Sequence, residues 1–236
     1  MTNSRYVGSE LEIFASATRW RSYWAEMVRP RLGTRILEVG AGIGSVTGVF
    51  SNSDNFWTAL EPDPEMVRKV KNQMLPPRTR VICGTLDNLD ESAAFDTVLY
   101  IDVLEHIDDD QNEIEKAAAL LLPGGRIIVL APAHNFLFSP FDTEVGHFRR
   151  YTRKSLGALR PAKFSEEISI YLDTLGVMAS VANKLLLRQE RPTESQVLFW
   201  DRYLIPISRI IDSLLHYRVG KSVLVVWVKP LAGLKT

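Results

Sequence analysis

The sequence predicts an α/β fold built on one doubly wound, seven-stranded, mostly parallel sheet. Two observations predict it. Apolar runs of strand length alternate with helical patterns along most of the chain, and a glycine-rich loop follows the first of these runs directly. The 236 residues, 46% of them hydrophobic, suit a single domain with a substantial core. We therefore treat residues 1–236 as one domain.

The alternation defines the elements in order. The first five predicted strands are Arg35–Val39, Trp57–Glu61, Arg80–Cys83, Phe95–Ile101 and Arg126–Ala131. The helices predicted between them are Ser45–Phe50, Pro64–Gln73 and Gln111–Leu122. A strand–helix–strand order places these strands in parallel, with helices on both faces. Two later runs, Glu167–Leu172 and Ser222–Val228, predict an antiparallel ending of the sheet.

Two segments stand outside this alternation. Residues 1–30 include Leu11–Val28, whose aromatic residues recur at helical spacing, and we expect either a helix packed on the sheet or a helical lid. Residues 183–218 form a long apolar insertion between the last two strands. We expect one or two helices there, which cover a substrate pocket, form a homodimer interface or extend the core. Its apolar residues are Leu185, Leu186, Leu187, Phe199, Trp200, Tyr203, Leu204, Ile207, Ile210, Ile211 and Leu214.

Composition narrows the function classes. Twenty-eight basic residues balance 28 acidic ones, so general nucleic-acid binding is not expected. The single cysteine, Cys83, excludes an intrachain disulfide and a cysteine-based metal cluster, and its apolar surroundings predict a buried thiol. The chain shows no signal-peptide pattern and no transmembrane segment of about 20 apolar residues. We expect a cytoplasmic enzyme, with a peripheral membrane contact left open.

The loop in "RILEVGAGIGSVTG" places Gly40, Gly42 and Gly44 after the first strand, where a ligand can approach the backbone closely. A phosphate-binding P-loop ends in Gly-Lys-Ser/Thr, and no lysine is near. A dinucleotide site prefers G-x-G-x-x-G, but here Ser45 occupies the place of the third glycine. That spacing weakens the dinucleotide interpretation without removing it.

Two carboxylates indicate a different ligand. Glu38, inside the first strand, would repel a pyrophosphate but suits an ammonium group. Glu61, at the end of the second strand, can accept hydrogen bonds from both hydroxyls of a ribose. A ligand that carries both a cation and a ribose fits this pair, and S-adenosylmethionine is such a ligand.

From about Leu37 to Ala131 the sequence resembles the class I S-adenosylmethionine-dependent methyltransferases, which have a Rossmann-like fold. The resemblance rests on several motifs in order: "LEVGAGIG", "LEPDPEM", "CGTLDNL", "FDTVLYIDVLEHIDD" and "LLPGGRIIVLAP". In the last of these we expect Pro123, Gly124 and Gly125 to reverse the chain.

The resemblance implies a set of cofactor contacts. Glu61 would hold the ribose, Pro62 or Asp63 would lie beside the adenine, and Tyr100, Ile101 and Asp102 would line the methionine end. Thr85 stands where many relatives carry an aspartate, so we expect the backbone of Thr85 and Leu86 to contact the adenine edge. The predicted cofactor-binding residues are Trp20, Glu38, Gly40, Gly42, Gly44, Glu61, Pro62, Gly84, Thr85, Leu86, Tyr100, Ile101 and Asp102. His106, in the same signature, either packs the turn or takes part in chemistry.

The methyl acceptor is expected beyond the fifth strand, in "APAHNFLFSPFDTEVGHFRRYTRKSL". Its Gly-His-x-x-x-Tyr pattern is similar to a segment of small-molecule methyltransferases, including quinone O-methyltransferases. We predict His147 as the general base, because a hydroxyl acceptor usually needs one. The predicted acceptor-binding residues are His134, Phe138, Arg150 and Tyr151.

Arg149, Arg150 and Tyr151 either recognise an anionic group or precede a helix that is capped by Thr152. No metal site is predicted, because the acidic run Asp108, Asp109 and Asp110 suits the start of a helix.

The resulting hypothesis is methyl transfer from S-adenosylmethionine to a small molecule, with an oxygen acceptor favoured over carbon or nitrogen. The acceptor would be a secondary metabolite or a substrate of lipid or isoprenoid type. Two alternatives remain: a nicotinamide-dependent oxidoreductase, and a non-catalytic module that binds S-adenosylmethionine. The oxidoreductase leaves Glu38, "VLEHI" and "LLPGG" without an explanation.

Overall fold

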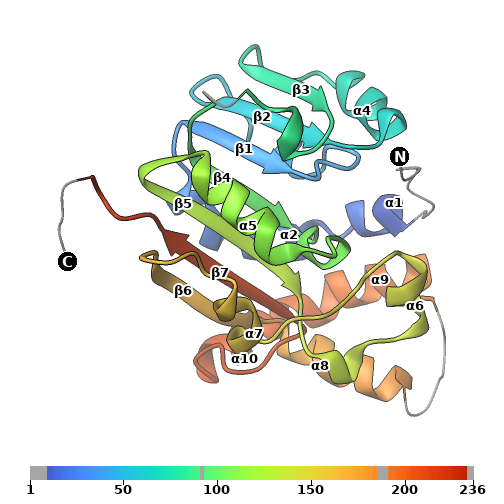
Figure 1. Cartoon of the computed structure of the whole chain (residues 1–236). Helices are drawn as coiled ribbons and strands as arrows, with labels where there is room; N and C mark the ends of the chain where they lie inside the picture. Colours follow the sequence, from blue (N-terminus) through green and yellow to red (C-terminus); the bar gives the residue numbers. More distant parts are fainter. Residues whose placement is uncertain (1–9, 91–92, 185–190, 233–236) are drawn as a thin grey trace.

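A computed structural model describes residues 10–90, 93–184 and 191–232, and its centre is one seven-stranded sheet (Figure 1). The strands lie in the order β3-β2-β1-β4-β5-β7-β6, in which β7 runs antiparallel to both of its neighbours. They are β1 (Arg35–Val39), β2 (Phe56–Glu61), β3 (Thr79–Cys83), β4 (Phe95–Ile101), β5 (Leu121–Pro132), β6 (Ser165–Leu172) and β7 (Ser222–Val228). The predicted fold class is confirmed.

Helices cover both faces of this sheet (Figure 1). They are α1 (Glu10–Ala15), α2 (Thr18–Val28), α3 (Thr47–Phe50), α4 (Pro64–Lys71), α5 (Asp110–Ala119), α6 (Pro140–Glu144), α7 (Arg153–Ala158), α8 (Thr174–Ala182), α9 (Glu194–Phe199) and α10 (Ile205–Leu214). A π-helical stretch, η6 (Trp200–Leu204), joins α9 to α10. Helices α5 and α7 contribute to one core layer, and α2, α3 and α10 to the other. No helix in the described ranges combines the length and hydrophobicity needed to cross a bilayer.

The central strands are apolar on both sides because both faces are covered. In β1, Ile36 packs into the layer with α2, while Leu37 and Val39 pack into the layer with α5. In β5, Ile127 and Ile128 divide between the layers in the same way. This alternation means that position along a strand decides which layer a side chain enters.

The parallel strands β1, β2, β4 and β5 all end at the same edge of the sheet, and the antiparallel β7 begins there. Pro132 at the end of β5 pairs with Ser222 at the start of β7. Loops that follow the parallel strands therefore meet the residues just before β7. In an open α/β sheet this carboxyl edge is where ligands bind.

Several predicted boundaries need correction. The segment Leu11–Val28 forms two helices, because the chain breaks at Ser16 and Ala17 between α1 and α2. The helical region between the last two strands begins earlier than residue 183, with α8, whose N-cap Asp173 accepts a hydrogen bond from the backbone N–H of Gly176. Leu185, Leu186 and Leu187 lie outside the described residues.

Two local expectations are wrong. Pro123–Gly125, which we expected to be a turn, lies within β5, because Leu121 already pairs with Phe95 of β4 across an irregular register. The thiol of Cys83 is exposed, not buried. Strand β3 is at the edge of the sheet, so its side chains lack the double cover of the central strands.

Candidate active site

A cavity of about 1020 Å³ opens at the carboxyl edge of the sheet. One half, which we call the cofactor half, is formed by α1, the start of α2 and the loops after β1, β2 and β3. The residues that line it are Leu11, Phe14, Trp20, Val39, Gly40, Gly42, Glu61, Pro62, Met66, Gly84 and Thr85. Most of the predicted cofactor residues are thus brought together in one place.

Two of the three loop glycines face this half. Gly40 has a φ of +68°, and a Cβ there would lie 2.6 Å from a methyl group of Val103. Any larger residue would therefore both strain the backbone and collide with the wall of the cavity. Gly42 also has a positive φ and space around it, whereas Gly44 faces Gln73 and does not line the cavity.

Glu61 is fixed by the backbone on either side of it. One carboxylate oxygen accepts a hydrogen bond from the N–H of Gly42 at 2.8 Å, and the other accepts one from the N–H of Asp63 at 2.9 Å. Burial raises the pKa of Glu61, although these two hydrogen bonds oppose the shift. Each carboxylate oxygen can accept a further hydrogen bond, so the side chain fits the two hydroxyls of a ribose.

Glu38 does not line the cavity, which corrects the predicted cofactor contact. It lies on the same side of β1 as Ile36, where one of its oxygens accepts hydrogen bonds from the Thr47 hydroxyl and from the indole N–H of Trp57. Burial raises its pKa to about 7. Glu38 therefore holds α3, and with it the glycine loop, against the side of β1 that carries Ile36.

The methionine end of the predicted site is only partly as expected. Asp102 lines the cavity with a left-handed backbone, at a φ of 53°. Its carboxylate is open to the cavity but enclosed by its walls, and this enclosure raises its pKa to about 6. Tyr100 and Ile101 do not line the cavity, and neither does Leu86. Tyr100 is fully buried, and its hydroxyl donates to Glu113.

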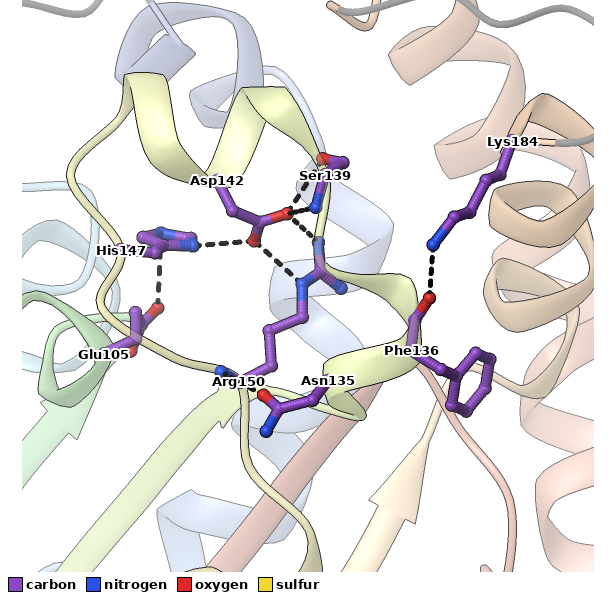
Figure 2. Close-up of polar contacts among 8 residues, drawn as sticks. All are labelled: Glu105, Asn135, Phe136, Ser139, Asp142, His147, Arg150 and Lys184. Atoms are coloured by element: carbon purple, nitrogen blue, oxygen red, sulfur yellow. Dashed lines mark hydrogen bonds and ion pairs between the residues drawn. The ribbon is translucent and has the colours of Figure 1, made fainter.

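The other half, which we call the acceptor half, contains the predicted base. The ring of His147 lies between two carboxyl groups, as Figure 2 shows. Its Nδ1 is 2.8 Å from Oδ1 of Asp142, and its Nε2 is 3.9 Å from Oε1 of Glu105. His147 follows Gly146, whose φ of +86° turns the chain back toward α6 so that the N–H of His147 reaches the carbonyl of Asp142.

Asp142 is the most heavily hydrogen-bonded group here. Besides His147, it accepts from Nε and Nη2 of Arg150 at 2.8 and 3.0 Å, and from the backbone N–H and hydroxyl of Ser139 at 2.9 and 2.8 Å (Figure 2). Burial alone would raise the pKa of Asp142, but these donors and the Arg150 charge hold it well below its usual range. Because an ionised Asp142 can only accept, Nδ1 of His147 carries a proton, and in the neutral ring the lone pair is on Nε2.

Glu105 and His106 complete this corner of the cavity. Glu105 is fully buried, and burial followed by the nearby Asp102 charge raises its pKa well above the usual range. Burial also lowers the pKa of His106, to about 4, so its ring is neutral. Ligand atoms of Glu105, His106 and His147 lie within 4.8 Å of one another, close enough to hold a metal ion, although the sequence predicted no metal site.

Other predicted acceptor contacts are not at the cavity. Tyr151 is buried, and its hydroxyl donates to Asp110 at 2.7 Å, so it joins α5 to the end of the loop. His134 stacks between Phe136 and Tyr171, and Phe138 does not line the cavity. Of the two arginines, Arg150 lines the cavity, whereas Arg149 pairs with Asp108 and Asp110 outside it. The alternative in which Thr152 caps a helix is confirmed for α7.

A family model described as a methyltransferase domain matches residues 37–129. These residues form a class I S-adenosylmethionine-dependent methyltransferase domain. The cofactor of this family is S-adenosylmethionine.

Relatives of the methyltransferase domain include quinone enzymes. The chain is 29% identical over 150 residues to a demethylmenaquinone methyltransferase of Tropheryma whipplei (strain Twist), a match that spans 62% of this chain and 59% of the relative. It is 32% identical over 104 residues to a ubiquinone biosynthesis O-methyltransferase of Xylella fastidiosa (strain 9a5c), over 42% of each. The chain thus spans about three fifths or less of these relatives' lengths.

The fold of the methyltransferase domain is also that of solved structures. The N-methyltransferase NodS from Bradyrhizobium japonicum WM9, solved in complex with S-adenosyl-L-homocysteine, superposes with a TM-score of 0.56 and 11% identity. The match covers 92% of this chain and 88% of that one. At this identity the likeness concerns the fold alone.

Sequence reasoning missed several residues of this cavity. Lys221 lines the acceptor half just before β7, with its ammonium 5.4 Å from the ring centre of Trp200. Burial lowers the pKa of Lys221, while the charge of Asp173 opposes the shift. The antiparallel start of β7 could have placed Lys221 at this edge. The role of Asp142 could have been suspected from the spacing of Ser139 and Asp142, which is typical of a capping box.

Proposed function

We propose that the chain transfers the methyl group of S-adenosylmethionine to an oxygen atom of a small, largely apolar acceptor, and that His147 accepts the acceptor's proton. The observation that carries this proposal is the placement of His147. Its Nδ1 is held by an ionised Asp142, which leaves Nε2, 3.9 Å from Glu105 in the wall of the same cavity, as the candidate base. The glycine loop and Glu61 line the other half of the same cavity.

The bound cofactor would supply a methyl group that is already activated by its positive sulfur. Gly40 and Gly42 would let it approach the backbone, and Glu61 would accept hydrogen bonds from its ribose. The chain's own contribution is then to align the acceptor oxygen with the methyl group. As the oxygen–carbon bond forms and the sulfur–carbon bond breaks, Nε2 of His147 takes the hydroxyl proton, and Asp142 stabilises the resulting imidazolium.

The acceptor class is supported by the cavity wall and by the relatives. Phe141, Val197, Phe199, Trp200 and Leu204 line the acceptor half, which suits a ring with an apolar substituent. Two similar proteins are named for the methylation of quinone precursors, one of them as an O-methyltransferase. We infer that a hydroxylated aromatic ring of this kind is the acceptor.

The helices before β1 and those between β6 and β7 have a proposed role in closing the site. Leu11, Phe14 and Trp20 line the cofactor half, and Trp20 lies 5.8 Å from Trp200 between ring centres. We propose that residues 1–30 act as a lid and that residues 183–218 act as a cap over the acceptor. This role is compatible with α2, which also packs Tyr23, Trp24 and Val28 against the sheet.

Calorimetry with S-adenosylmethionine and, separately, NADH tests the cofactor. We expect micromolar binding of the first and none of the second, and NADH binding alone would overturn the proposal in favour of an oxidoreductase. An acceptor screen with hydroxylated aromatics then tests turnover. In the same assay His147→Ala should slow transfer about 10²- to 10⁴-fold while cofactor affinity stays unchanged. An equal loss of cofactor affinity would contradict the catalytic role.

A further inference from the structure

The helical rod formed by α9, η6 and α10 buries polar residues on its inner side, beside the apolar Val197 and Ile205. Its buried residues include Asp201, Ser208 and Asp212. Asp201 accepts hydrogen bonds from the backbone N–H groups of Arg19 and Trp20, at 3.2 and 2.8 Å, and so caps the start of α2. The polar side chain of Asp201 therefore makes its contacts within the protein.

Asp212 and Ser208 make their contacts in the same way. Asp212 accepts from the hydroxyl of Tyr23 and from the backbone N–H groups of Asp173 and Thr174, all within 2.9 Å. Ser208 donates to the carboxylate of Asp173 at 2.8 Å. Because the rod contacts the rest of the protein through these polar residues, its opposite side faces solvent.

The outer side of the rod is apolar, which inverts the usual pattern of a surface helix. Six large apolar side chains there are each between 44% and 73% exposed. We call them the apolar stripe: Leu198, Phe199, Tyr203, Ile207, Ile210 and Leu214. From Phe199 the stripe recurs every three or four residues over about 22 Å, as one helix face does. An exposed apolar surface of this size marks an interaction site.

The charges beside the stripe indicate its partner. Residues 198–214 contain two acids and two arginines, and the acids, Asp201 and Asp212, are both buried. Both arginines, Arg202 and Arg209, are exposed, but Arg209 pairs with Glu26 at 2.6 Å, so the outward positive charge beside the stripe comes from Arg202. An exposed apolar helix face with an outward positive charge beside it suits the interface of an anionic lipid bilayer.

The stripe also connects to the cavity. Phe199 is more than half exposed and also lines the acceptor half. Its neighbours Val197, Trp200 and Leu204 line the cavity from the other side of the same rod. A molecule that leaves a bilayer at Phe199 would therefore meet apolar side chains of this rod on its way into the site.

We propose that the apolar stripe docks the protein on the surface of an anionic lipid bilayer, and that the acceptor enters the cavity from the bilayer past Phe199. The docking stands independently of the reaction. The entry route rests on the proposed function.

Vesicle co-sedimentation without cofactor or acceptor tests the docking by itself. The protein should bind phosphatidylcholine vesicles that contain phosphatidylglycerol, and bind pure phosphatidylcholine more weakly. Ile210→Gln combined with Leu214→Gln should reduce binding about tenfold or more, because two exposed anchors are lost. Arg202→Gln should weaken binding only to the anionic vesicles. The matched control is Met74→Gln, a fully exposed apolar residue on the loop after α4, which should bind as the wild type does.

Three outcomes would overturn the proposal. These are failure of the wild type to bind anionic vesicles, binding that is insensitive to the double substitution, and a wild-type dimer that the double substitution converts to a monomer on gel filtration. The last would assign the stripe to a second copy of the chain. Melting temperatures of the variants near the wild-type value would show that the fold is intact. Loss of vesicle binding with methyl transfer to a soluble acceptor retained would separate docking from the proposed chemistry.

Discussion

Asp142 holds His147 and Arg150 with the same carboxylate oxygen, Oδ1, at 2.8 Å from each. The carboxylate therefore does two things at once. It fixes which nitrogen of His147 carries the proton, and it keeps the buried Arg150 charge paired. The base and the wall of the acceptor half are thus coupled through one group that does not itself face a reacting atom.

The first prediction concerns this coupling. Asp142→Asn can present its amide N–H to Nδ1 of His147, which would place the proton on Nε2 and remove the base. We expect kcat to fall by about 10²- to 10⁴-fold while cofactor affinity is unchanged. Steady-state kinetics and calorimetry on the same sample measure both, with the exposed Asp87→Asn as a control. A kcat within twofold of the wild type would mean that Asp142 only supports the loop.

A second prediction concerns the ribose. Glu61→Gln replaces one acceptor oxygen with an amide donor that faces the backbone N–H of Gly42 or Asp63. We expect S-adenosylmethionine affinity to fall about 10- to 100-fold, as for the loss of a hydrogen bond to a charged group. Calorimetry measures this loss, and Glu166→Gln on the exposed part of β6 should leave affinity as it is. If the affinity of Glu61→Gln were unchanged, the ribose would not bind at Glu61.

A third prediction concerns pH and Glu38. Its folded-state pKa of about 7 exceeds the ordinary 4.5, so the native state binds a proton more tightly than the unfolded chain does. The corresponding stability is present in full below about pH 4.5 and is lost as pH rises through 7. Glu38→Gln lacks this titration. As pH rises between these values, the free energy of unfolding of the variant should therefore increase by about 3 kcal/mol relative to that of the wild type.

Urea unfolding of both proteins across pH 4.5 to 8 measures that difference. Glu115→Gln, on the exposed side of α5, controls for a general charge effect and should follow the wild type. A constant gap between wild type and Glu38→Gln would show that folding does not raise the pKa of Glu38.

A fourth prediction concerns metal removal. Glu105, His106 and His147 have the spacing of a metal site, but burial raises the pKa of Glu105 well above its usual range and so favours its neutral form, and Asp142 is already paired with Arg150. A metal ligand must be deprotonated, so this set offers a dication little negative charge. We expect the rate after dialysis against EDTA to match that of untreated enzyme. Loss of rate that is restored by Mg²⁺, Mn²⁺ or Zn²⁺ would make His147 a metal ligand instead of a base.

The order of elements was predictable because each central strand is apolar on both faces and is followed by a recognisable helix. Strands β1, β4 and β7 have the predicted bounds. The glycine loop and Glu61 were predictable for the same reason, since a strand end and the loop after it fix where they lie. Glu38 was wrongly predicted to contact the cofactor because the alternation of side chains along a strand was not considered. It shares a side of β1 with Ile36, whereas Val39 faces the cavity.

After the fifth strand the sequence has no regular hydrophobic period from which the orientation of side chains could be predicted. His147 and Tyr151 are four residues apart in one loop, yet one lines the cavity and the other is buried against α5. That difference is made by Gly146, by the bridge between Ala133 and Tyr151, and by Asp110, which is distant in sequence. Lys221 is likewise placed by the antiparallel pairing of β5 and β7, a relation between strands about 90 residues apart.

Apart from the corner formed by Glu105 and His106, the two halves of the cavity come from successive parts of the chain. The glycine loop and Glu61 precede residue 130, and the wall formed by Phe141, Arg150, Trp200 and Lys221 follows it. The segment that matches the family model ends at residue 129. The sequence of the second part can therefore change while that of the first is kept. A chimera joined within β5 would accordingly exchange the acceptor preference and retain the methyl donor.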